Sequence, residues 1–158
     1  MKVGVSGASG FLGGRLVKYL ASKGYEVFAL SRSQRRKEEF EALGIQLLSD
    51  NPYAEDKLKV HLEGKDMLVH CAALSSPWGK FEDFHQINVG LSQKLLEASR
   101  KAGIQRFINI SSPSIYFDFT DRLGIKESDP LPEVFVIAYA ETKLLAEVWA
   151  LSQHGKDI

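Results

Sequence analysis

The sequence predicts an α/β fold, a doubly wound parallel sheet of about five strands with helices on both faces. Short apolar segments alternate with helix-length segments along the chain, which is the pattern of β-α-β units rather than of a helix bundle or a β-sandwich. A glycine-rich turn at residues 7–13 joins the first strand to the first helix. The 158 residues include 44% hydrophobic and 25% charged side chains, an ordinary composition for one globular domain. A chain of this length needs no disulfide or metal to hold its core.

The first half of the chain is expected to supply three strands, each followed by a helix. Apolar residues recur at helical spacing after the glycine-rich turn until Gly24 ends that helix, and a charged helical segment follows the second strand. In chain order, we expect a strand at 2–6, a helix from 11 to 24, a strand at 25–30, a helix at 34–43, a strand at 45–48 and a short helix at 53–62.

The second half is expected to supply two more strands and two long helices. Residues 67–72 hardly alternate between apolar and polar, which indicates a strand buried on both faces. The polar, proline-marked segment 113–132 is too long for an ordinary connection, so we expect an active-site loop there. In chain order, we expect a strand at 67–72, an amphipathic helix at 81–101 that Ala102 and Gly103 end, a strand at 106–110 and a helix at 138–153.

The charge balance excludes several classes of partner. Twenty Lys and Arg residues match twenty Asp and Glu residues, so the chain has no net charge at pH 7. We therefore expect neither nucleic acid nor an anionic membrane as a partner. Apolar stretches such as 67–74 are far shorter than the roughly 20 residues that span a membrane. The lone Cys71 has no disulfide partner and no leader-like segment follows Met1, so we expect a soluble, cytoplasmic protein.

The glycine-rich turn is the first feature that carries chemistry. Gly7, Gly10 and Gly13 recur at three-residue spacing between the first strand and the first helix. A pyrophosphate needs a tight turn, a close approach of side-chain-free backbone and helix N–H groups that point at the anion. A flexible glycine-rich loop is the simpler interpretation, but the position between a strand and an amphipathic helix favours a dinucleotide site.

The segment VSGASGFLGGRL resembles the G-x-x-G-x-x-G turn of the short-chain dehydrogenase/reductase superfamily. The resemblance is to its extended branch, which holds nucleotide-sugar epimerases, dehydratases and 3β-hydroxysteroid-dehydrogenase-like enzymes. It implies a Rossmann fold over residues 1–158 and a dinucleotide at the turn. The turn residues that it implies as cofactor contacts are Gly7, Ser9, Gly10, Phe11, Leu12 and Gly13.

The residues after the second strand indicate which dinucleotide binds. A free ribose 2′-OH calls for Asp or Glu there, but the chain has Ser31 followed by Arg32. A hydroxyl and a guanidinium suit a 2′-phosphate, so we predict NADP as the cofactor, with NAD as the alternative. We expect Arg35 or Arg36 to make a weaker third contact. Together with Lys37 they also fit a solvated helix face, although cations in the first turn of a helix oppose its dipole.

The same resemblance implies five further cofactor residues. Asp50 matches an Asp that receives the adenine amino group, with Asn51 beside it, although a lone Asp also fits a helix cap. Ala72 and Ala73 belong to a segment HCAALSS that resembles the family's H-x-A-A segment, whose small residues let the backbone pass close to the cofactor. Asn88 matches the family's helix Asn, and an exposed polar helix residue is the competing interpretation.

A candidate catalytic group lies near the end of the chain. Tyr139 and Lys143 are four residues apart on an expected helix and therefore share one face, where an ammonium lowers the pKa of a phenol toward neutral. By itself this spacing also fits an ordinary helix surface. The family's S-S-x-x-x-Y pattern implies Ser112 as the third catalytic residue, with Ser111 as the adjacent alternative, and places Tyr116 either in the substrate pocket or in the core. The resemblance also implies that Tyr139 and Lys143 contact the nicotinamide ribose.

These features predict an NADP(H)-dependent oxidoreductase that interconverts a secondary alcohol and a ketone. An NAD-dependent nucleotide-sugar epimerase or dehydratase and a non-catalytic dinucleotide-binding module remain as alternatives. The four His residues have no ligand spacing, so no metal site is expected. Because the resemblance covers only the first part of an extended member, we expect a chain truncated before a sixth strand and lacking a C-terminal substrate domain. An open sheet edge would then favour self-association, for example as a homodimer.

Overall fold

One parallel sheet organises the protein. The computed structural model describes residues 1–155 and 158. Its five strands are β1 (Lys2–Ser6), β2 (Glu26–Leu30), β3 (Gln46–Leu48), β4 (Met67–His70) and β5 (Arg106–Asn109), in the order β3-β2-β1-β4-β5. All four pairings are parallel. The predicted fold class is confirmed, and the order reverses between β1 and β4, which is where doubly wound sheets bind ligands.

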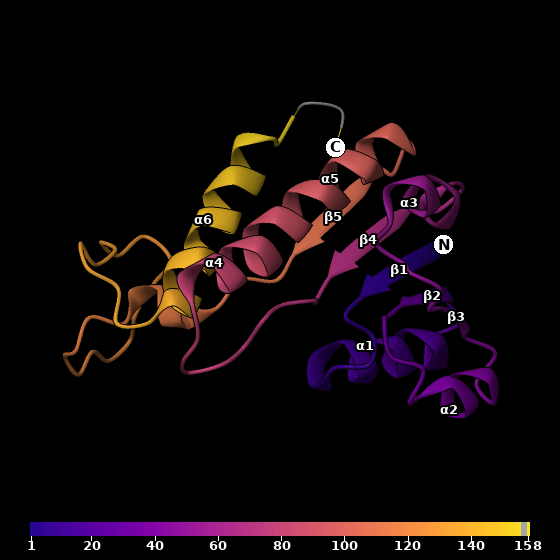
Figure 1. Cartoon of the computed structure of the whole chain (residues 1–158), viewed down its shortest axis with the longest axis horizontal. Coiled ribbons are helices and arrows are strands. Elements are labelled where there is room, and N and C mark those ends of the chain that lie inside the picture. Colours follow the sequence, from indigo (N-terminus) through magenta and orange to yellow (C-terminus); the bar gives the residue numbers. More distant parts are fainter. Residues whose placement is uncertain (156–157) are drawn as a thin grey trace.

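Helices cover both faces of this sheet (Figure 1). They are α1 (Phe11–Ser22), α2 (Lys37–Glu41), α3 (Glu55–Leu62), α4 (Phe81–Phe84), a π-helical turn η1 (His85–Gly90), α5 (Leu91–Lys101), a 3₁₀ turn η2 (Pro113–Tyr116) and α6 (Ala138–Ser152). In Figure 1, α1 and α2 lie on one side of the sheet, and α3, α5 and α6 on the other. Within residues 1–155 and 158, no helix combines the length and apolar character that crossing a membrane requires.

Two buried apolar clusters, one on each face, hold these layers together. On the first face, Val17 of α1 and Phe40 of α2 pack against β1 and β2. On the second, Leu58 of α3 and Leu95 of α5 pack against the sheet. Adjacent residues of β4 point to opposite clusters, because successive strand side chains alternate between faces. This explains why residues 67–72 show no alternation of apolar and polar side chains.

Several elements differ in extent from the sequence predictions. The strand expected at 67–72 ends at His70, because the Ala72 N–H donates to the Ser6 side chain rather than to a backbone carbonyl. The helix expected at 34–43 is only Lys37–Glu41. The single helix expected at 81–101 contains the π turn of η1 in its middle. The short helix begins at Glu55, because Tyr53 is instead bonded to β2.

The fold makes a specific prediction about two glycines with left-handed backbone. Gly7 has φ of +67°, and a Cβ there would lie 2.6 Å from the Ala72 nitrogen, whereas Gly24 has φ of +81° and open space around it. In both Gly→Ala variants the alanine must adopt a left-handed backbone conformation, which costs free energy. Only Gly7→Ala also forces the glycine-rich turn away from the backbone at Ala72. Urea unfolding is expected to show that Gly7→Ala loses about 1–3 kcal/mol more than Gly24→Ala. Equal losses would contradict this account of the turn.

Candidate active site

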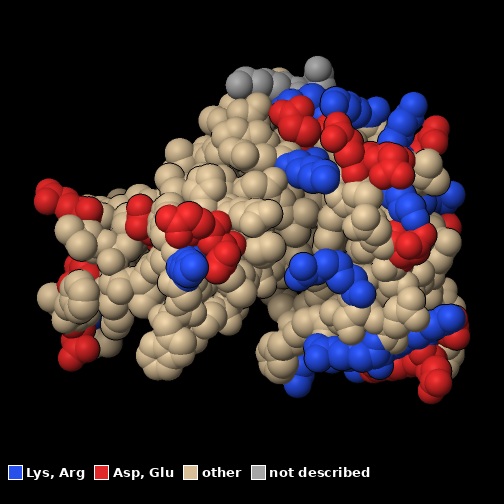
Figure 2. Space-filling model, in the orientation of Figure 1, with Lys and Arg blue, Asp and Glu red and all other residues tan. Residues whose placement is uncertain are grey.

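A cavity of about 850 Å³ opens at the carboxyl ends of β1, β2 and β4. Seven of the predicted cofactor residues line it, namely Gly7, Ser9, Gly10, Ser31, Arg32, Ala72 and Ala73. On the face drawn in Figure 2, the surface is notched between the lobe of α1 and α2 and the lobe of α4 and α6. The cavity therefore lies where the strand order reverses, as expected for a ligand site of this architecture.

The glycine-rich turn supplies backbone alone to the floor of this cavity. The Gly10 N–H donates to the Gly7 carbonyl at 2.9 Å, which closes the turn. A Cβ at Gly13 would collide with the same carbonyl, so this glycine permits close packing of helix on strand. Gly10 is the N-cap of α1 and offers no side-chain cap to the first helical N–H groups. Such a cradle fits a pyrophosphate, because those N–H groups and the helix dipole favour an anion.

Tyr53 also belongs to this site, although the sequence reasoning missed it. Its hydroxyl accepts from the Gly7 N–H and donates to the Leu30 carbonyl, both at 3.1 Å, so it links the ends of β1 and β2. Burial raises the pKa of this phenol. Residue 53 had no signal beyond its place at an expected helix start, so only the tertiary structure reveals this role.

The turn after β2 presents one cation to the cavity. The buried Ser31 hydroxyl donates to the Ser33 carbonyl at 3.0 Å and accepts from the Ser33 N–H at 3.1 Å, so it shapes the turn. Arg32, the next residue, is exposed and lines the cavity, as does Ser33. Lys94 of α5 lines it too and was not identified from sequence.

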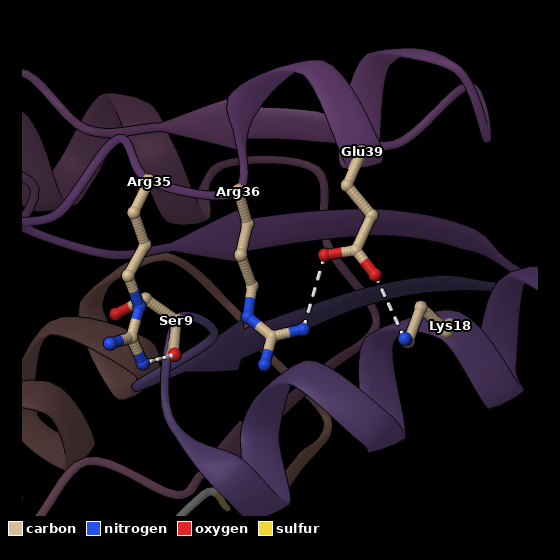
Figure 3. A network of polar contacts seen from close by, with 5 residues as sticks. All are labelled: Ser9, Lys18, Arg35, Arg36 and Glu39. Atoms are coloured by element: carbon tan, nitrogen blue, oxygen red, sulfur yellow. Dashed lines mark hydrogen bonds and ion pairs between the residues drawn. The ribbon is translucent and has the colours of Figure 1, made fainter.

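The two following arginines have different partners (Figure 3). Arg35 reaches across to the glycine-rich turn and donates to the Ser9 carbonyl. Arg36 pairs with Glu39 at 3.1 Å, and Lys18 of α1 pairs with the same carboxylate at 2.8 Å. The Lys18 hydrogen bond is the main cause of the lowered pKa of Glu39.

The start of α2 corrects the expectation that Arg35 and Arg36 lie in the first turn of a helix. Because α2 begins at Lys37, Arg36 is its N-cap and Arg35 precedes it, so neither lies in the first turn of the helix. The Arg36 guanidinium also packs against α1, where a Cβ at Gly14 would lie 2.9 Å from the arginine Cζ. Arg36 is therefore bound to a carboxylate beside α1, whereas Arg35 bonds directly to the turn.

Asp50 and Asn51 lie after β3. The Asp50 side chain is 89% exposed and forms an ion pair with Lys57, which lowers the pKa of the carboxyl. The N-cap of α3 is Ala54, so the interpretation of Asp50 as its cap is wrong. Asn51 has a left-handed backbone with φ of 44°. Phe11 and Leu12, at the start of α1, are exposed.

Asn88 is buried, so its interpretation as an exposed helix residue is wrong. Its Oδ1 accepts from the Leu74 N–H at 2.8 Å, and its Nδ2 donates to the Leu74 carbonyl at 3.2 Å and to Thr142 Oγ1 at 3.0 Å. Asn88 thereby ties the loop after β4 to α6. In that loop, Cys71 is half-buried and lines the cavity, and burial raises the pKa of its thiol to about 11, which argues against a nucleophile.

Of the predicted catalytic residues, Lys143 and Ser112 lie at the end of β5, but none of Ser112, Tyr139 and Lys143 is among the described residues that line the cavity. Lys143 is 3% exposed, and its ammonium donates to the carbonyl of Ile110, directly after that strand. Burial lowers the pKa of this ammonium. Tyr139 lies one turn earlier on α6 and is half-buried. The helix therefore fixes Lys143 at the end of β5.

Serines follow the same strand. The Ser112 hydroxyl lies 2.7 Å from the Ser114 hydroxyl and accepts from the Ser114 N–H at the start of η2. The Ser111 hydroxyl is buried and has no hydrogen-bond partner among the residues that the structure describes. Tyr116 lies outside the cavity described above and donates to the Glu127 carbonyl at 3.0 Å, which tethers the long loop.

Comparison with known proteins places this geometry in a family. A model described as the NAD dependent epimerase/dehydratase family matches residues 3–157. The chain belongs to this family. The resemblance seen in the glycine-rich turn is thereby confirmed over nearly the whole chain.

Relatives of this family member include several reductases. It is 36% identical over 155 residues to a 4-hydroxy-2-methyl-3-oxo-4-farnesyl-3,4-dihydroquinoline-1-oxide ketoreductase of Stigmatella aurantiaca, covering 98% of this chain and 46% of the relative. It is 33% identical over 162 residues to a 2-alkyl-3-oxoalkanoate reductase of Stenotrophomonas maltophilia, covering 100% and 48%. The chain thus spans about half the length of these curated relatives.

Solved structures of the family share the fold. A UDP-N-acetylglucosamine 4-epimerase from Bacillus cereus superposes with a TM-score of 0.81 at 28% identity, covering 99% of this chain and 56% of that one. A UDP-glucuronic acid 4-epimerase from Bacillus cereus in complex with NAD gives a TM-score of 0.77 at 28% identity, covering 98% and 52%. This member of the epimerase/dehydratase family therefore shares its fold with about half of each epimerase.

Proposed function

We propose that the chain is the NADP(H)-binding part of an oxidoreductase that interconverts a secondary alcohol and a ketone. The observation that carries the proposal is the position of Lys143, buried at the end of β5 with Tyr139 one helical turn away, on the carboxyl edge that also forms the glycine-lined cavity. This edge combines a dinucleotide cradle with an acid/base pair. When bound, the cofactor supplies or accepts a hydride.

Tyr139 transfers the proton in this proposal, with help from Lys143 and Ser112. In the reducing direction, the Tyr139 hydroxyl donates its proton to the carbonyl oxygen of the substrate, which becomes the alcohol O–H. The Lys143 ammonium stabilises the resulting phenolate, and its bond to the Ile110 carbonyl holds it in position. The Ser112 hydroxyl exchanges its bond to Ser114 for one to the substrate oxygen and stabilises the charge that develops there.

The charges around the cavity support NADP(H) rather than NAD(H). Arg32 and Lys94 are among the described residues that line the cavity, whereas no Asp or Glu is. A carboxylate would accept from a free ribose hydroxyl and repel a 2′-phosphate, and a guanidinium does the opposite. On the face drawn in Figure 2, Lys and Arg gather on the α1 and α2 side of the notch. We assign the 2′-phosphate to Arg32 and Ser33, with Arg35 nearby and Arg36 held back by Glu39.

A second candidate is an NAD-dependent epimerase or dehydratase. Structural neighbours with bound NAD include a UDP-glucuronic acid 4-epimerase and MoeE5, the latter with UDP-glucose. An epimerase uses the same acid/base pair, so cofactor preference is the property that discriminates between the two candidates. A binding module without catalysis is the third alternative, and the presence of Tyr139, Lys143 and Ser112 together argues against it.

Arg32→Ala is expected to weaken NADPH binding by about tenfold or more while NADH affinity changes by less than about threefold, because only NADPH carries the phosphate that pairs with the guanidinium. Titration followed by reduced-nicotinamide fluorescence measures both constants. Arg106→Ala is the matched control, since it removes the same charge from the amino end of β5. Tighter binding of NADH than of NADPH by the unmodified chain would sink the cofactor assignment.

Tyr139→Phe is expected to lower NADPH-dependent reduction of a panel of ketones by at least about a hundredfold, because the acid that protonates the carbonyl is lost. Affinity for NADPH should change by less than about threefold. Tyr19→Phe removes the hydroxyl of an exposed tyrosine on α1 and serves as the control. Unchanged turnover in Tyr139→Phe would refute the mechanism.

A further inference from the structure

A buried histidine at the centre of the sheet has no part in the mechanism above. His70 ends β4 and is 1% exposed. Its Nδ1 lies 2.7 Å from Ser6 Oγ at the end of β1, and its Nε2 lies 2.9 Å from Ser92 Oγ on α5. Both serines are also buried. The imidazole therefore bridges a strand and a helix inside the protein.

The partners of the two serines fix the direction of every hydrogen bond. Ser92 Oγ donates its single proton to the Asn88 carbonyl at 2.6 Å, so it can only accept from His70 Nε2–H. In a neutral imidazole Nδ1 is then the acceptor. Ser6 Oγ accordingly donates to Nδ1 and accepts from the Ala72 N–H at 3.3 Å. The hydrogen bonds thus all run in one direction, from the Ala72 N–H in the loop after β4 to the Asn88 carbonyl in the π turn η1.

The side chain of Asn88 extends this hydrogen-bond network to α6, the helix that carries Tyr139 and Lys143. The Asn88 side chain holds Leu74 and donates to Thr142 Oγ1 at 3.0 Å. Thr142 Oγ1 in turn donates to the Ala138 carbonyl at 2.8 Å and lies 3.1 Å from the Tyr139 carbonyl. The buried polar groups therefore connect the cavity wall at Ala72 with α6, through residues 1% exposed or less.

The environment keeps the imidazole neutral. Burial, together with the positive charge of Lys143, lowers the pKa of His70 to about 3. The ring therefore keeps one proton throughout the neutral pH range, and the direction of these hydrogen bonds does not change with pH in that range. A buried network whose members are all satisfied makes a structure more rigid than isolated bonds do.

We propose that His70 is a positioning residue that sets the cofactor loop at Ala72 against the π turn at Asn88, and so sets the dinucleotide cavity relative to Tyr139 and Lys143. The inference rests on the proposed function, because it gives His70 a role in aligning a bound dinucleotide with the acid/base pair. An imidazole that only fills space would tolerate either tautomer and would not couple to Ser92.

The tautomer in the unmodified chain provides a test that needs no cofactor. Long-range ¹H–¹⁵N NMR of the histidine ring distinguishes a protonated ring nitrogen from a bare one. We expect His70 with Nε2 protonated and Nδ1 bare, unchanged between pH 5 and pH 8. A proton on Nδ1, exchange between tautomers or a second proton within this range would overturn the inference. The result stands whether or not the chain binds NADP(H), so the failure of either proposal can be recognised separately.

Paired serine variants test the coupling to the cavity. Ser92 and Ser99 are both buried on α5, but Ser99 Oγ has no hydrogen-bond partner within the described part of the chain. Ser92→Ala is expected to weaken binding of NADPH, or of NADH if that is the preferred cofactor, by about five- to tenfold, and Ser99→Ala by less than about twofold. Equal effects of the two variants would overturn the proposal.

A double-mutant cycle separates positioning from a general loss of stability. His70→Gln retains an amide donor for Ser92, so it is expected to keep more affinity than His70→Leu. The combination of Ser92→Ala with His70→Leu should cost no more affinity than the larger single effect, because both remove the same link. Additive losses in binding would contradict the proposal. If the His70 variants do not fold, the tautomer and the two serine variants still decide it.

Discussion

The close approach of two backbone segments, at Gly7 and at Ala72, is the constraint on which the candidate site depends. Parallel pairing of β1 with β4 brings the two segments together at one edge, and a side chain at Gly7 would lie 2.6 Å from the Ala72 nitrogen. No side chain caps the first N–H groups of α1, and Gly10 at its start lines the cavity. Tyr53 fixes the same glycine from the β2 side. The anion cradle therefore follows from strand order and from the absence of a Cβ.

Beneath this cradle the sheet contains polar side chains where apolar ones would be expected. Burying them is costly unless every group has a partner; His70 bonds to Ser6 and to Ser92 of α5, and Ser92 donates to the Asn88 backbone carbonyl. The same interior holds the Lys143 ammonium, whose partner is a backbone carbonyl rather than a carboxylate. The polar core thus joins the two halves of the site, and the apolar clusters on either face hold the helices against it.

Local patterns were sufficient to predict much of this arrangement. The five strands, the glycine-rich turn and the pairing of Tyr139 with Lys143 on one helix all follow from spacing along the chain. Residues whose roles depend on the exact start of a helix or on distant partners could not be predicted. The burial of Asn88 depends on a π turn and on α6, and the separation of Arg35 from Arg36 depends on Glu39 and the late start of α2. Local spacing does not predict the bonds of Arg35 to Ser9, of Asn88 to Thr142 and of Lys18 to Glu39, because they join segments far apart in the sequence.

A crystal structure of the chain with NADP⁺ tests the central claim most directly. The account predicts the pyrophosphate against the turn of residues 7–13, the 2′-phosphate within hydrogen-bond distance of Arg32, and the nicotinamide ring beside Tyr139 and Lys143. A dinucleotide whose pyrophosphate lies outside the cavity formed by residues 7–13 would contradict it. So would a complex in which Arg32 points away from the phosphate while the nicotinamide lies far from α6.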